Sequence, residues 1–445
     1  MAIKAVPTKN NIQKKKSTVV GRTKVKGTKR AAVSRNNAER RPVSARPAVK
    51  RAVPHMAAKR KVAAKKRNNG FFSMLFASDR KRGDLDYTFL LLVGVLVAFG
   101  LIMLLSASTP TADIKFGKSY YFFIRQFAYV AVGAVLMIVL SNIDYRRYKP
   151  FARLFMIVCI ALLGCVFLPG IGVSHNGSSR WINLGITEIQ PSEFTKLAVS
   201  MFYAAMIEDR VYKLTDFKEL MKSCIWIGVV AALMMCETHL SGTIVLCGIA
   251  GCVLLVGGAR IDWKILFGGG GALVAAAYAF LSLNPERMSR ITSFLDPFAD
   301  KLGEGYQTIQ SLYAIGSGGI FGKGLGQSIQ KFYIPEPYND FIFAIVCEEL
   351  GLIGAAFIIG LFICLVVRGV KIALEAPDVF GSLMVVGIVA QVAIQTILNI
   401  AVATSSVPNT GVSLPFFSYG GTAVMILLAE MGIVLSVSRF SAKNT

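Results

Sequence analysis

Long apolar runs limit the possible folds of this chain more than any other feature. They recur from Tyr87 almost to the C-terminus, and hydrophobic residues make up 54% of the 445 residues. A helix of about 20 apolar residues crosses the roughly 30 Å hydrocarbon core of a bilayer. Inside lipid, a chain must satisfy its own backbone hydrogen bonds, which helices do. The sequence therefore predicts an all-α integral membrane protein.

The apolar runs predict ten transmembrane helices, of which the fourth and fifth have the weakest signal. They are expected near 87–106, 127–143, 151–169, 194–207, 223–236, 241–258, 265–283, 341–367, 380–403 and 420–437. Cytoplasmic loops are enriched in Lys and Arg, and alternate loops do carry these residues. Both termini are therefore predicted to be cytoplasmic. The outward loops are expected to be 107–126, 170–193, a tight turn near 237–240, 404–419 and a large extracytoplasmic loop, 284–340, between helices 7 and 8.

The positive charge belongs to the N-terminal tail. Of a formal net charge of +24, the segment ending at Arg82 carries +23. Residues 1–69 have little apolar content and are predicted to be a disordered cytoplasmic tail. Such a tail is expected to bind anionic membrane lipids rather than nucleic acid. Residues 70–86 form a juxtamembrane interfacial segment, 87–438 the membrane domain and 439–445 the cytoplasmic C-terminus.

Two further features concern the start of the chain and its cysteines. The hydrophilic start argues against a cleaved signal peptide, so the first span is expected to be an uncleaved anchor. The eight cysteines lie in or beside apolar runs with no CxxC pair, which favours buried free thiols over disulfides or metal ligands.

The long loop 284–340 mixes six acids with five bases, as either a site for an anionic sugar substrate or a solvated loop would. Arg287, Arg290 and Lys323 are candidate substrate ligands there. The loop ends at Asp340, at the start of an apolar helix, where a partly desolvated carboxylate suits a general base. A helix-capping role for Asp340 is the alternative. Glu348 and Glu349 lie farther along this helix and are either functional or structurally paired.

Two other outward segments carry candidate substrate ligands. In 170–193, Pro191 can open a helix with Glu193 and Lys196 in its first turns. Arg180, Lys196 and a helix N-terminus could bind a pyrophosphate, with Gln190 and Glu193 beside them, or could form a salt-bridged helix start. The segment 404–419 is rich in hydroxyls, including the candidate Ser418, and precedes Gly420-Gly421. That chemistry fits a transporter as well as an enzyme.

Five sequence stretches together make this chain resemble the SEDS family of shape, elongation, division and sporulation proteins. They are SSRWI with QPSE, FLDPFAD, GEGYQTIQS, NDFIFAIVCEELG and NTGVSLPFFSYGG. The resemblance covers 86–439 and is greatest to the FtsW-type division or sporulation branch. The chain departs from the family in ETHLSGT, where Thr238 and His239 replace the usual Pro-Asp. No role is therefore transferred to His239.

The resemblance implies a ten-helix peptidoglycan glycosyltransferase that polymerises lipid II, an undecaprenyl-pyrophosphate-linked disaccharide-pentapeptide. Asp340 matches the essential aspartate of the family. A class B penicillin-binding protein and other division proteins are the implied partners, at the septal cytoplasmic membrane. In the expected mechanism Asp340 deprotonates the acceptor 4-hydroxyl, and Arg180 and Lys196 neutralise the leaving diphosphate. No cofactor is specified. A divalent cation such as Mg²⁺ stays open, because no clustered carboxylates define a metal site.

Two alternatives to the enzyme remain at the level of sequence. A lipid II flippase would also need many spans, polar residues in the bundle and a glycine-interrupted helix. A transporter is expected to place its sharpest acidic motif near the midplane, however, whereas Asp340 is predicted at the outer edge. A non-catalytic scaffold that recruits division proteins through the tail is compatible with either activity.

Overall fold

The computed structural model describes residues 83–175, 178–183, 185, 188–211, 214–237, 239–259, 294–299, 303 and 305–441. Within this part of the chain, seven helices are long and apolar enough to cross a membrane. The chain is accordingly a multi-pass, mainly helical membrane protein. The basic tail, most of the interfacial segment and the predicted span 265–283 lie outside the described residues. The count of ten helices therefore stays a prediction.

The helices follow the predicted apolar runs with shifted ends. The seven long apolar helices are α2 (Tyr87–Phe116), α3 (Tyr121–Ser141), η1 with α4 (Tyr145–Phe151 and Ala152–Cys165), α6 (Phe217–Cys236), α11 (Ile342–Leu374), α12 (Val379–Ala403) and α13 (Gly421–Arg439). Two shorter or more polar helices, α5 (Pro191–Glu208) and α7 (Leu240–Val256), occupy the predicted fourth and sixth spans.

The predicted outward segment 107–126 is mostly helical, and the prediction of a loop there was wrong. Helix α2 continues to Phe116, ends at Gly117 in the left-handed conformation, and is followed by α3 from Tyr121. The run of Ser, Thr and Pro after Leu105 ends the apolar pattern but not the helix. Ala107, Pro110 and Ala112 are buried, so packing against the bundle maintains the helix through its internal proline.

The predicted loop 170–193 contains three short strands that an all-α interpretation did not include. They are β1 (Gly172–His175), β2 (Ser178–Asn183) and β3 (Glu188–Ile189), in one antiparallel sheet of order β1-β2-β3. The strand β2 carries Arg180 and Trp181. The sheet thus places the first part of the predicted substrate segment just before α5.

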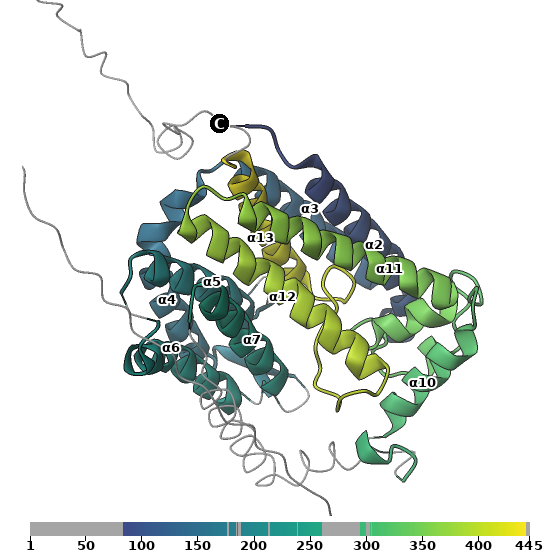
Figure 1. Ribbon diagram of the computed structural model, residues 1–445. Helices are drawn as coiled ribbons and strands as arrows, with labels where there is room; N and C mark the ends of the chain where they lie inside the picture. Colours follow the sequence, from purple (N-terminus) through teal and green to yellow (C-terminus); the bar gives the residue numbers. More distant parts are fainter. Residues whose placement is uncertain are drawn as a thin grey trace, which may run out of the picture. The chain divides into compact units, whose positions relative to one another are not determined.

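Helices α12 and α13 form the centre of the bundle. Helix α12 packs against α5, α7 and α11 (Figure 1), while α13 packs most extensively against α3. In their most apolar windows, 78% of α13 and 56% of α12 are buried, against 17% of α3. The outer helices therefore present their apolar faces outward, as expected for helices that contact lipid.

The long segment before α11 folds back onto that helix. It contains α10 (Tyr306–Gly318), which packs against α11, and the short η3 (Gln330–Phe332). Helix α11 is interrupted at Gly351, whose φ is 68°. At this break Leu352 N–H donates to Gly319 O (2.9 Å) and Ile353 N–H to Ile320 O (3.2 Å). The loop backbone thus replaces partners that an unbroken helix would supply.

Candidate functional site

Asp340 lies in a turn directly before α11. The N-cap of the helix is Phe341, whose side chain makes no capping hydrogen bond. Asp340 precedes this position by one residue, and the choice between a base and a capping role for it stays a prediction. Its backbone carbonyl is held by Asn399 of α12, whose Nδ2 donates to Asp340 O and to Val412 O, both at 2.7 Å. This amide joins the segment carrying Asp340 to the loop before α13.

The loop before α13 lies along the segment that carries Asp340. Ser418 Oγ donates to Asn339 O (2.7 Å) and accepts from Leu414 N–H (2.8 Å), and Tyr419 N–H donates to Tyr338 O (2.9 Å). Gly411 has a φ of 72°, and a Cβ there would lie 3.3 Å from Asp340 Oδ2. The loop backbone therefore faces the carboxylate closely, where glycine best fits both the conformation and the space.

The glycine pair at the start of α13 allows close helix packing, as expected from the sequence. Gly420 is the N-cap, and its N–H donates to Gln126 Oε1 of α3 (3.2 Å). A Cβ on Gly421 would lie 2.3 Å from the Tyr129 ring. A side chain at this position would therefore displace the Tyr129 ring. Ser418 is thereby held between α3, α13 and the Asp340 segment.

Helix α5 brings two predicted ligands together inside the bundle. It opens with Pro191 at its first position, as predicted. Lys196 Nζ contacts Glu193 Oε2 at 2.7 Å, with side chains only 4% and 12% exposed. A cavity of about 30 Å³ is lined by Glu193, Ser418 and residues of α12 and α13. The structure therefore places predicted ligands from two distant outward segments around one small cavity.

A further acid lies beside this ion pair. Glu430 of α13 is fully buried and accepts from Gln391 Nε2 of α12 at 3.0 Å, and Gln391 lines the same cavity. The charged groups that act on Glu430 electrostatically are Lys196 and Glu193. Sequence reasoning missed Glu430, although a Glu in the last apolar run was a visible signal.

The turn between α6 and α7 adds a second pair of buried polar groups. Glu237 and His239 are 2% and 7% exposed, and neither Glu237 oxygen nor His239 Nδ1 has a hydrogen-bond partner among the described residues. Burial raises the pKa of Glu237 to about 8 against the opposing charge of Arg180. Burial, with Arg180 and Lys196 nearby, lowers the pKa of His239 to about 3. Arg180 thus acts electrostatically on both members of the pair.

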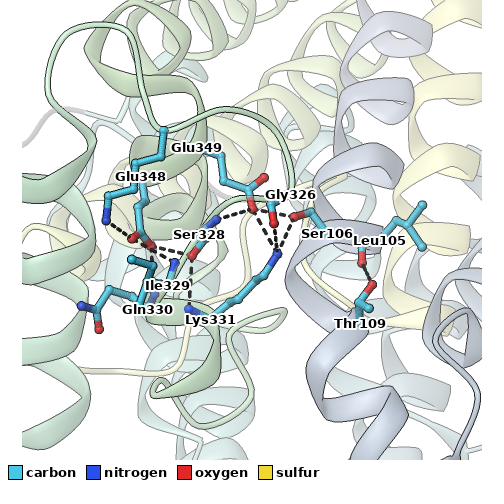
Figure 2. Close-up of polar contacts among 11 residues, drawn as sticks. Leu105, Ser106, Thr109, Gly326, Ser328, Ile329, Gln330, Lys331, Glu348 and Glu349 are labelled. Carbon is cyan, nitrogen blue, oxygen red and sulfur yellow. Dashed lines mark hydrogen bonds and ion pairs between the residues drawn. The ribbon is translucent and has the colours of Figure 1, made fainter.

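Lys323 occupies a different setting from the other candidates. Its Nζ contacts Glu348 Oε1 of α11 at 2.7 Å, and Glu348 is completely buried. Lys331 lies 3.5 Å from Glu349 Oε1 in the same way. Figure 2 shows these acids and the loop that contacts them. Both glutamates are thus paired with a lysine, and Lys323 is the partner of Glu348.

The structure describes only some of the remaining residues that the sequence predicted to be functional. Gln190 is the N-cap residue of α5 without a side-chain cap, and its carbonyl accepts from Glu193 N–H at 3.1 Å. Arg287 and Arg290 lie outside the described residues. Within the described ranges, no three His, Cys, Asp or Glu side chains cluster as metal ligands. The eight cysteines are free thiols, with Cys159 and Cys347 buried but Cys236 and Cys364 exposed.

A protein-family model described as "Cell cycle protein", covering FtsW, RodA and SpoVE, matches residues 86–443. Stage V sporulation protein E of Bacillus subtilis (strain 168) is 43% identical, over 81% of this chain and 99% of its own length. A probable peptidoglycan glycosyltransferase FtsW of Geobacter metallireducens is 38% identical, over 79% of this chain and 94% of its own length.

Two kinds of solved structure share the fold. One belongs to a study of how a peptidoglycan synthase complex coordinates polymerization and crosslinking, with a TM-score of 0.68 and 27% identity over 80% of this chain and 98% of that one. The other is the rod shape determining protein RodA of Thermus thermophilus, with a TM-score of 0.60 and 25% identity over the same shares.

Proposed function

We infer, from the fact that this chain belongs to the FtsW, RodA and SpoVE family of cell cycle proteins, that it is a peptidoglycan glycosyltransferase. Its substrate is lipid II, which it polymerises into glycan strands during cell division. The relatives of the FtsW type carry this activity in their names. The activity needs a base for the acceptor hydroxyl and charge neutralisation for the leaving diphosphate.

The proposed general base is Asp340. The observation that supports it best is the fixed contact between its segment and the loop before α13. Asn399 joins the two backbones, and Gly411 leaves its face open toward Asp340 Oδ2. A carboxylate whose backbone is held in this way can accept the proton of the acceptor 4-hydroxyl as the oxygen attacks the donor anomeric carbon. The C–O bond to undecaprenyl pyrophosphate breaks in the same step.

The proposed diphosphate ligands are Arg180 and Lys196. Lys196 is held by Glu193 at the start of α5, beside the cavity that Ser418 also lines. A buried ammonium that already has an acidic partner can shift toward a diphosphate without crossing bulk water. Gln190 supplies a neutral hydrogen bond to sugar or phosphate oxygens, whereas the Ser418 hydroxyl, which already donates to Asn339 O, accepts one from a sugar hydroxyl. Arg287 and Arg290 remain weaker candidates, and Lys323 is assigned to its contact with Glu348.

The proposal extends to topology and partners. Ten spans with both termini in the cytoplasm place the Asp340 end of the bundle outside the cell, where lipid II sugars are exposed. A class B penicillin-binding protein that cross-links the strands is the proposed partner, at the division septum. The likeness to a synthase complex that coordinates polymerization and crosslinking supports this pairing. The basic tail acts on anionic lipids and not in the reaction.

One assay separates polymerase from flippase. Purified full-length protein with its penicillin-binding partner is incubated with lipid II, and the length of the glycan strands is measured on gels. Asp340→Asn keeps the side-chain shape but cannot accept a proton at neutral pH, so synthesis should fall about 10²- to 10⁴-fold. Asp113→Asn is the control, because it removes the same charge from an exposed site on α2. Strand synthesis by Asp340→Asn within a few-fold of wild type would reject the assignment.

A further inference from the structure

We propose that Glu348 and Glu349 are positioning residues for the glycosyl transfer, holding the segment that presents Asp340 through a buried anchor. The buried anchor is defined here as Glu348, Glu349, Lys323, Ser328 and Lys331. This inference rests on the proposed function, because it assumes that Asp340 is the base.

Glu348 gathers the loop around one carboxylate. Its Oε1 accepts from Lys323 Nζ (2.7 Å) and Ile329 N–H (3.1 Å). Its Oε2 accepts from Ser328 Oγ (2.5 Å) and Gln330 N–H (3.2 Å). A carboxylate with several charged and backbone donors is well compensated despite complete burial. The loop conformation over 328–330 therefore depends on this acid.

Glu349 connects the same loop to another helix. Its Oε1 accepts from Ser106 Oγ of α2 at 2.6 Å and from Ser328 N–H at 3.3 Å. Lys331 Nζ, 3.5 Å from that oxygen, also donates to Gly326 O at 2.7 Å. Figure 2 shows Lys331 reaching between Glu349, Gly326 and Ser106. Three elements, namely α2, the loop and α11, thus meet at one charge-balanced cluster.

The backbone interlocks at the same level. Lys323 N–H donates to Glu348 O (2.9 Å) and Gly324 N–H to Glu349 O (3.0 Å), next to the break at Gly351. A Cβ on Gly322 would lie 2.2 Å from Glu349 O, so only glycine permits this approach. The first part of α11, residues 342–350, is consequently held at its far end by the loop. Asp340 directly precedes its near end.

The anchor is too far from Asp340 to touch the reacting atoms. Glu348 and Glu349 follow Asp340 by eight and nine positions, which at about 1.5 Å per helical residue corresponds to about 12 to 14 Å. The anchor can affect the position of Asp340 only through residues 342–350 and through the loop from Lys331 to Asp340. Misplacing a catalytic group by about 1 Å can cost roughly 10²-fold in rate. Weakening the anchor should therefore reduce turnover rather than substrate binding.

The test uses Glu348→Gln in the full-length protein with its penicillin-binding partner. We expect kcat for strand synthesis to fall about 100-fold while KM for lipid II stays within about threefold. Hydrogen exchange should become faster over 326–341 but not over α12. Glu219→Gln is the matched control, because its 2.7 Å pair with Lys222 is exposed. It should leave both measurements unchanged.

A second variant guards against a folding defect. Lys323→Met with Glu348→Met removes both charges, and replacing a buried ion pair by apolar residues is often tolerated. It still lacks the acceptor for Ile329 and Gln330 N–H, so turnover should stay low in stable protein. Wild-type kcat in either folded variant, a defect in KM alone, or unchanged exchange over 326–341 would overturn the proposal. Full-rate synthesis by Asp340→Asn would instead overturn the base itself.

Discussion

Two buried glutamates of this protein have opposite surroundings. Glu348 in α11 accepts hydrogen bonds from Lys323, Ser328 and two backbone N–H groups. Glu237, after α6, is 2% exposed, yet neither of its oxygens has a hydrogen-bond partner among the described residues. An unpaired buried polar group costs about 1 to 3 kcal/mol. Such a cost is explained more readily at a functional site than in a scaffold.

The contrast divides the site into a fixed side and an adaptable side. On the fixed side, the anchor and Asn399 hold the segment of Asp340. On the adaptable side, Glu237 and His239 interact electrostatically with Arg180, and they carry buried polar atoms that a bound substrate or water can still satisfy. A glycosyltransferase needs both kinds of surroundings, because its base must be rigid while its diphosphate ligands must release product.

On the adaptable side, the largest effect should come from removing the cation. Lys196→Met leaves Glu193 without its 2.7 Å partner and takes a charge from the proposed leaving-group site. We expect strand synthesis to fall about 10²- to 10³-fold. Lys222→Met breaks a pair of equal length and spacing that is exposed, and it should have little effect. Equal activity of the two variants would show that Lys196 is not a ligand of the leaving diphosphate.

Arg180→Lys sharpens the same prediction. It keeps the charge but loses the planar group that binds phosphate through two parallel hydrogen bonds. Lipid II binding should weaken about tenfold, measured as the Kd in detergent micelles. Unchanged affinity in both Arg180→Lys and Lys196→Met, with stable protein, would indicate that these residues only hold the start of α5.

On the fixed side, Gly351→Ala tests how much the stability of the protein depends on the break in α11. Gly351 has a φ of 68°, and a Cβ there would lie 2.3 Å from Gly322 N. Strain and overlap together should cost about 3 kcal/mol or more. Gly360→Ala in the same helix meets nothing within 4 Å and should change stability by at most about 1 kcal/mol. Thermal unfolding of both variants measures the difference, and equal Tm values would contradict the interlock.

The sequence patterns predicted which helices form better than where each helix ends or which distant residues pair. Pro191 correctly opened α5 and placed Glu193 and Lys196 inside, because proline at the first helical position is a local rule. The end of α2 was misplaced, since burial of Ala107, Pro110 and Ala112 carries the helix beyond the apolar run. No local rule pairs Lys323 with Glu348, 25 residues apart. The sequence left the partner of Glu348 open because only the folded loop brings Lys323 beside it.

The smallest effect concerns pH. Burial raises the pKa of Glu237 to about 8, so the folded carboxyl keeps a proton that the unfolded chain loses above about pH 4.5. The free energy of unfolding should therefore fall as pH rises toward 8. The lowered pKa of His239 matters only below about pH 6.5, where the unfolded imidazole takes up a proton.

Comparison between pH 6.5 and pH 8 thus isolates Glu237. Glu237→Gln cannot titrate, so its Tm should fall less than that of wild type over this interval, by about 2 to 4 °C. The charge of Arg180 opposes this rise in the pKa of Glu237. Replacing Arg180 by Met should therefore raise that pKa further and enlarge the pH dependence of the Tm. Identical pH dependence of Glu237→Gln and wild type would show that Glu237 finds a charge-stabilising partner in the membrane.

The most direct test of the account is a double-mutant cycle between the base and its anchor. Single-turnover strand synthesis is measured for wild type, Asp340→Asn, Glu348→Gln and the double variant, with enzyme in excess over lipid II. If Glu348 acts only by positioning Asp340, the double variant should be no slower than Asp340→Asn alone, because residues that act as a unit are not additive. Losses that multiply in the double variant would contradict the account and show that Glu348 serves the protein independently of Asp340.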